Sequence, residues 1–122
     1  MLNGRTALVV EEEFLIALDI QRMLEMLGAG QTLFAGTASD AENLRDQWPD
    51  IGIAIVEVGG RHTAAGHLVQ ALHQAGVPMV LTTADVLVSQ DPGAFPELAI
   101  IPKPIPEDAM VSAVRKALTA GV

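Results

Sequence analysis

Acidic, hydroxyl and basic side chains stand at the ends of four apolar runs. The first run ends in Glu11–Glu13, the second carries Glu57 near its end, the third ends in Thr82–Thr83, and Lys103 follows the fourth. A glutamate triplet by itself is explained as readily by a solvated face as by a site. A carboxylate inside an apolar run, however, is costly to bury without a partner, and Lys103 is the obvious counter-ion for Glu57. We therefore interpret Glu57 and Lys103 as members of one site.

The elements that position these residues are predicted from the spacing of apolar side chains. Short apolar runs without polar alternation are typical of strands buried on both faces. They predict strands at Arg5–Val10, Gln31–Ala35, Ile51–Val58, Pro78–Thr82 and Ala99–Ile101. Helical spacing, capping signals and helix stops predict helices at Phe14–Leu27, from the capping box Ser39–Glu42 to Pro49, at Thr63–Ala75, and from Pro106 onward.

The segment Ala84–Leu98 is the irregular part of this pattern. A helix is expected there, but Asp91-Pro92-Gly93 and Pro96 leave room for only a turn or two. We predict a short or irregular fourth helix.

Strands that alternate with helices imply an α/β fold, a doubly wound five-stranded parallel sheet with right-handed crossovers and helices on both faces. In such sheets, ligands bind outside the carboxyl ends of the strands, where the strand order reverses. The acids, the hydroxyls and the lysine should therefore converge on one edge of the sheet.

Composition excludes several classes of function. The chain has 122 residues, which suits a single domain over residues 1–122, and it has no cysteine. Its net charge of −8 has the wrong sign for binding a nucleic-acid backbone. We find no signal peptide and no apolar stretch of the roughly 18 residues that a membrane span needs. We expect a cytoplasmic protein with no nucleic-acid or membrane partner.

Four segments, in this order and spacing, resemble the motifs of response-regulator receiver domains of two-component signalling systems. They are Ala7–Glu13, Ile53–Glu57, Val80–Ala84 and Lys103-Pro104, and the resemblance covers essentially the whole chain. It implies the flavodoxin-like strand order 2-1-3-4-5 and a receiver-like domain without an output domain.

The resemblance also implies a role for each residue that matches a motif. Glu57 stands at the position of the aspartate that accepts phosphate from a histidine kinase, Thr83 would supply the hydroxyl that bonds the phosphoryl group, and Lys103 would pair with that group. By the same match of positions, the groups that would hold a magnesium ion are Glu11, Glu12, Glu57 and the backbone carbonyl of Gly59.

The sequence departs from the family pattern at two of these positions and at a switch position outside them. Glu57 and Glu12 replace the usual aspartates, and each added methylene moves a carboxylate by up to about 1.5 Å, one C–C bond length. Misplacement of that size can slow in-line phosphoryl transfer on the order of 100-fold, and magnesium demands near-ideal octahedral geometry. Ile100 replaces an often aromatic switch residue.

We therefore predict a pseudo-receiver, without enzymatic activity, that binds a histidine kinase, a phosphotransfer protein or an effector protein. One alternative is a receiver that a histidine kinase still phosphorylates. A less supported alternative is a small flavodoxin-like enzyme or nucleotide binder, because the sequence lacks a phosphate-cradling loop. We further expect a direct ion pair between Glu57 and Lys103 that imitates part of the phosphorylated state, and an acidic edge that gains stability from divalent ions.

Overall fold

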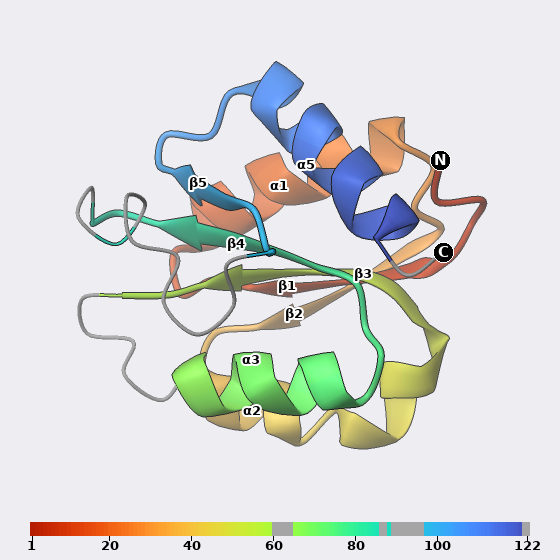
Figure 1. Ribbon diagram of the computed structural model, residues 1–122, viewed down its shortest axis with the longest axis vertical. Helices are drawn as coiled ribbons and strands as arrows, with labels where there is room; N and C mark the ends of the chain where they lie inside the picture. Colours follow the sequence, from red (N-terminus) through yellow and green to blue (C-terminus); the bar gives the residue numbers. More distant parts are fainter. Residues whose placement is uncertain (60–64, 86–87, 89–96, 121–122) are drawn as a thin grey trace.

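The computed structural model describes residues 1–59, 65–85, 88 and 97–120, and Figure 1 shows how the elements are arranged. The strands are β1 (Thr6–Val10), β2 (Gln31–Ala35), β3 (Ile51–Glu57), β4 (Met79–Thr83) and β5 (Ile100–Pro102). The helices are α1 (Phe14–Met26), α2 (Ala38–Glu42), the 3-10 helix η1 (Arg45–Asp50), α3 (Ala65–Gln74) and α5 (Glu107–Thr119).

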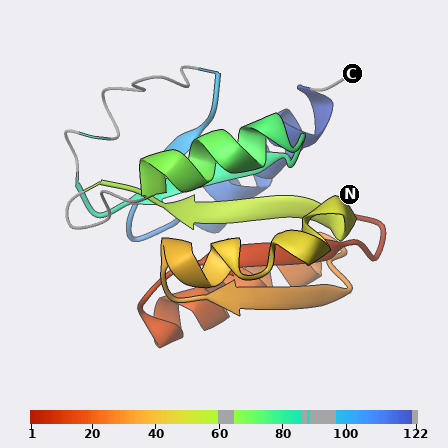
Figure 2. The ribbon, with the colours of Figure 1, turned by 90° about the horizontal axis from the view of Figure 1, so that it is seen from below.

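The five strands form one parallel sheet in the order β2-β1-β3-β4-β5. Helices α1 and α5 cover one face of the sheet, and α2 and α3 cover the other, as the two views in Figures 1 and 2 agree. The predicted fold class and strand order are confirmed.

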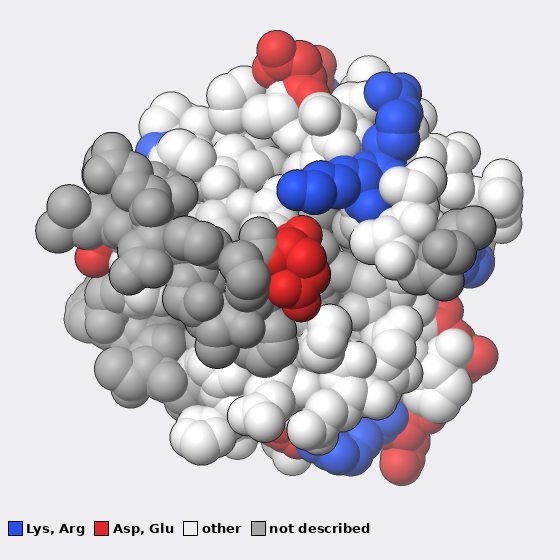
Figure 3. Space-filling view, viewed as in Figure 1, with Lys and Arg blue, Asp and Glu red and all other residues white. Residues whose placement is uncertain are grey.

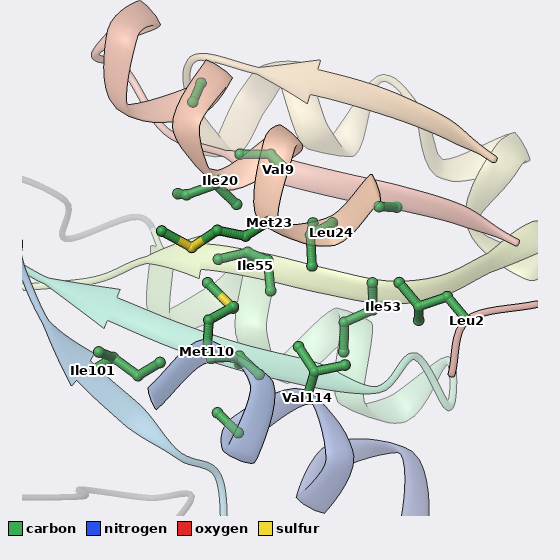
Figure 4. Close-up of a cluster of buried hydrophobic side chains, with 14 residues drawn as sticks. Leu2, Val9, Ile20, Met23, Leu24, Ile53, Ile55, Ile101, Met110 and Val114 are labelled. Carbon is green, nitrogen blue, oxygen red and sulfur yellow. The ribbon is translucent and has the colours of Figure 1, made fainter. Parts of the chain in front are cut away.

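The two faces of the sheet have separate hydrophobic cores. Successive strand residues point to opposite faces, so Val9 and Ile55 pack with α1 and α5 (Figure 4), whereas their neighbours Leu8 and Val56 pack with α2 and α3. Every residue of β3 is buried, which explains why this strand has no polar alternation.

The second helix differs from its prediction. It begins two residues earlier than the capping box suggested, because Thr37 is the N-cap and its side chain accepts a hydrogen bond from the Asp40 backbone N–H at 3.1 Å. It ends at Glu42, and the chain continues as the separate 3-10 helix η1. Trp48 of η1 is buried and its Nε1 donates to the Ala41 carbonyl at 3.2 Å, which ties the two short helices together.

Two predictions fall partly on residues outside those described. Most of Ala84–Leu98 lies outside them, so the form of the fourth helix stays a prediction, and α3 is described only from Ala65. Among the described residues no helix has both the length and the apolar content to cross a membrane.

Candidate functional site

The alternation of side chains along the strands gathers three charged residues on one side of the sheet. Val9, Ile55 and Ile101 all belong to the core beneath α1 and α5. Glu11, Glu57 and Lys103 each come two residues later and therefore share that side. The carboxyl ends of β1, β3 and β5 thus bring together residues that are far apart in the sequence.

Lys103 forms ion pairs with both carboxylates. Its Nζ lies 2.7 Å from Glu11 Oε1 and is in direct contact with Glu57 Oε2. The side chains of Glu11 and Glu57 are buried, with exposed fractions of 1% and 6%, and the Lys103 side chain is 9% exposed. The predicted Glu57–Lys103 ion pair is confirmed, and Glu11 is an additional partner.

The charge of Lys103 is maintained by these contacts. Burial by itself would lower the pKa of the ammonium, but hydrogen bonds and charge attraction from Glu11 and Glu57 outweigh it and raise the pKa above its ordinary value. Lys103 is therefore fully charged at neutral pH.

Glu11, Glu57 and Lys103 form a charged triad. Hydrogen bonds from backbone N–H groups hold Lys103 and Glu11 in place. The Lys103 N–H donates to the Thr83 carbonyl at 2.8 Å, which extends the pairing of β4 and β5 past the strand end. The second carboxylate oxygen of Glu11 accepts from the Glu13 N–H at 3.0 Å, in the turn that leads into α1. Glu11 thus joins Lys103 to the start of α1. The peptide bond between Lys103 and Pro104 is cis.

The two threonines that end β4 occupy different environments. Thr83 is buried, and its hydroxyl accepts a hydrogen bond from the Asp85 N–H at 3.0 Å. Thr82 pairs in register with Glu57, and its buried hydroxyl has no hydrogen-bond partner in the part of the chain that the structure describes. No separate role was predicted for Thr82. Its place in strand register with Glu57 becomes visible only once the pairing of β3 and β4 is known.

Gly59 lies close to Thr83 and has a conformation that favours glycine. Its φ is +86°, and a Cβ atom there would lie 2.8 Å from Val88 Cγ2 and 3.0 Å from Thr83 Oγ1. A larger residue would therefore disturb the loop around Thr83. The role of its carbonyl as a metal ligand stays a prediction.

The residues predicted to hold magnesium do not fit that ion as the structure places them. Glu12 is exposed, whereas Glu11 and Glu57 are buried, and the Lys103 ammonium lies against both buried carboxylates. Among the described residues, no three acidic, histidine or cysteine side chains are grouped so that they could hold a metal ion. Magnesium would have to compete with the Lys103 ammonium for the same two carboxylates.

A largely apolar hollow of about 220 Å³ lies beside the triad. It is lined by Lys103 and by residues of α1 and of the turn that follows β5: Leu15, Ile16, Asp19, Ile20, Pro104 and Ile105. At its edge Leu15 is 79% exposed, and the neighbouring Phe14 is 69% exposed. Such exposure of large apolar side chains next to a hollow is typical of a surface that binds another protein.

On the face of the molecule in Figure 3, a group of basic side chains lies at the upper right, close to an acidic group near the centre, and acidic and basic side chains adjoin at the lower edge. Most of the rest of the coloured surface on that face is uncharged.

Comparison with known proteins supports the fold directly. No protein-family model matches this sequence, and no curated protein matches it. Solved structures do match: the PhyR response regulator REC domain of Erythrobacter litoralis has a TM-score of 0.77 at 19% identity, covering 95% of this chain and 91% of that one. The chain has the receiver fold.

Two further structures extend this comparison. A response regulator from Thermotoga maritima has a TM-score of 0.77 at 20% identity, with 95% of this chain and 98% of that chain covered. The response regulator PhyR from Brucella abortus has a TM-score of 0.76 at 24% identity, and this chain spans 49% of its length. The receiver fold is thus found both as a whole chain and as about half of a longer one.

Proposed function

We propose that this protein is a pseudo-receiver, a signalling module with the receiver fold that acts by binding another protein and is not phosphorylated at Glu57. The observation that carries the proposal is the contact of the Lys103 ammonium with both Glu57 and Glu11. The lysine that would pair with a phosphoryl group in a cycling receiver is thereby already engaged by two carboxylates.

The position of Glu57 supports a partial imitation of the phosphorylated state. A glutamate reaches about 1.5 Å farther than an aspartate, toward the region that a phosphoryl group would fill. Its contact with Lys103 ties the end of β3 to the end of β5 without phosphate. Because one carboxylate carries less charge than the roughly −2 of a phosphate, the imitation is incomplete.

Phosphorylation at Glu57 is disfavoured by the same contacts. Attack on a phosphodonor needs a carboxylate oxygen placed in line and a metal that neutralises developing charge. Here one Glu57 oxygen contacts Lys103, and Glu12 of the expected metal set is exposed. The alternative of a phosphorylated receiver therefore requires the triad to open first.

The proposed partner is a histidine kinase, a phosphotransfer protein or an effector protein, met in the cytoplasm. The hollow beside Lys103 and the exposed apolar residues at the start of α1 offer the contact surface. A partner bound there would lie beside the triad and would respond to its state.

Incubation with a small phosphodonor and magnesium, followed by intact-mass measurement, tests the proposal. We expect no stable mass gain for the wild-type protein, and at most partial labelling for the variant E57D, because Glu12 still departs from the family pattern. A receiver domain with an aspartate acceptor, treated in parallel, shows that the donor is active. A stable mass gain mapped to Glu57 in the wild-type protein would overturn the proposal.

A further inference from the structure

We infer that Lys103 takes the place of a divalent cation, so that this site is held together without metal and cannot be switched by magnesium. The inference builds on the proposed function, since it concerns the same carboxylates. It is the opposite of the expectation that the acidic edge gains stability from divalent ions, and the experiment below decides between the two.

The charges of the described residues at the site disfavour a divalent ion. Among these residues, the two buried carboxylates and the Lys103 ammonium together carry a single net negative charge. Adding a doubly charged ion beside Lys103 would reverse the sign of the local charge and place two cations near each other in a poorly solvated place. Such an arrangement is strongly unfavourable where water cannot screen it.

Both oxygens of the Glu11 carboxylate already have a contact within the protein. Lys103 contacts Glu11 through Oε1, and the other Glu11 oxygen accepts from the Glu13 N–H. A metal at Glu11 would therefore have to share a carboxylate oxygen with either the ammonium or the Glu13 N–H. Lys103 is itself held by the hydrogen bond from its N–H to the Thr83 carbonyl, so the ammonium is attached to the end of the sheet.

Removal of the lysine should allow Glu11 and Glu57 to bind a divalent ion. Without the ammonium, Glu11 and Glu57 would form a buried pair of carboxylates whose two negative charges match one divalent ion. Oxygen ligands of this kind suit Mg²⁺ and, with less demanding geometry, Ca²⁺ and Mn²⁺. The variant K103M should thus acquire a metal dependence that the wild-type protein lacks.

Thermal melting with and without divalent ions gives the first readout. At 10 mM Mg²⁺ or Ca²⁺, compared with potassium chloride of equal ionic strength, we expect no shift for wild type. For K103M we expect a saturable rise in Tm of about 5 °C once the ion exceeds its Kd about tenfold. The exposed Lys116 provides the matched control, because K116M should behave as wild type does.

Manganese broadening of amide NMR signals gives a second readout that does not depend on stability. In K103M, signals of Glu11, Glu57 and Gly59 should broaden at Mn²⁺ concentrations that leave them sharp in wild type, and K103M/E57Q should lose the effect. If K103M does not fold, K103Q serves in its place, because it removes the charge but keeps polar hydrogen-bonding capacity.

Broadening centred on Glu11 and Glu57 in the wild-type protein would overturn the inference. So would a K103M or K103Q protein that folds but shows neither a Tm rise nor broadening. These outcomes concern metal binding alone, whereas failure of the proposed function appears as phosphate mass on Glu57. The two results are read from different measurements and can be told apart.

Discussion

At Lys103, one ammonium serves two buried carboxylates, so the members of the triad should not contribute independently to stability. Removing the lysine leaves Glu11 and Glu57 buried without their shared cation, and we expect K103M to lower the free energy of unfolding by about 3–5 kcal/mol. The variant E57Q leaves the Glu11–Lys103 pair intact and should cost less. The double variant should cost less than the sum of the two single changes, by about 1–3 kcal/mol.

Urea denaturation of wild type, both single variants and the double variant measures this coupling. K116M, at an exposed position of α5, should stay within about 0.5 kcal/mol of wild type. Additive losses would mean that Glu57 and Lys103 do not interact in solution, and the proposal that their ion pair imitates part of the phosphorylated state would be wrong.

The neighbouring threonines Thr82 and Thr83 allow a matched test of the hydroxyl environments. T82V replaces a buried hydroxyl that has no hydrogen-bond partner among the described residues, so we expect stability to rise by up to about 1 kcal/mol. T83V removes the acceptor of the Asp85 N–H and should lower stability by about 1–2 kcal/mol. Chemical denaturation of both variants measures these changes in stability. Equal effects at the two positions would contradict the assigned environments.

At the scale of elements, α1 presents large apolar residues both to the core and to solvent. Ile20 and Leu24 are buried against the sheet, whereas Leu15 in the first turn and Met26 at the end of the helix are exposed to 79% and 69%. Leu15 lines the hollow beside Lys103, whereas Met26 lines a separate and smaller hollow of about 110 Å³ at the other end of the helix. The two residues therefore allow the proposed contact surface beside the triad to be tested against a second exposed position.

We therefore expect L15D to lose binding to the protein partner, and M26D to keep it. Both changes place a carboxylate at an exposed position of the same helix, so both variants should have the melting temperature of wild type within about 2 °C. Pull-down from a lysate of the source cells, quantified for the three proteins against a mock column, is the measurement. Equal capture by L15D and wild type would remove the start of α1 from the proposed interface.

At the scale of the whole molecule, one sheet is shared by two hydrophobic layers. Leu24 is fully buried in the layer beneath α1 and α5, and Leu72 is fully buried in the layer beneath α3. Because the same strands form one wall of both layers, the molecule should unfold as a single unit.

We expect L24A and L72A each to lower the free energy of unfolding by about 2–5 kcal/mol. Each variant should show a single transition whose denaturant dependence equals that of wild type, by fluorescence of the buried Trp48 and by far-UV circular dichroism alike. Separate transitions for the two probes in either variant would show that the layers fold independently.

Much of this architecture was determined by the sequence alone, because it depends on local patterns. Apolar runs and helical spacing predicted the five strands and the helices α1, α3 and α5, and alternation of strands with helices predicted the parallel sheet. The same runs marked Glu57 and Lys103 as a pair, since a carboxylate in an apolar strand needs a cation.

Only the tertiary structure decided which side chains meet at the edge of the sheet. The glutamates Glu11 and Glu12 are adjacent in sequence, yet one is buried against Lys103 and the other is exposed, because the chain turns into α1 at that point. The site of Thr82 opposite Glu57 depends on the register of β3 and β4, and the start of α2 depends on a hydrogen bond from Asp40 to Thr37. Strand register and side-chain direction arise from packing between distant segments, and local spacing does not encode them.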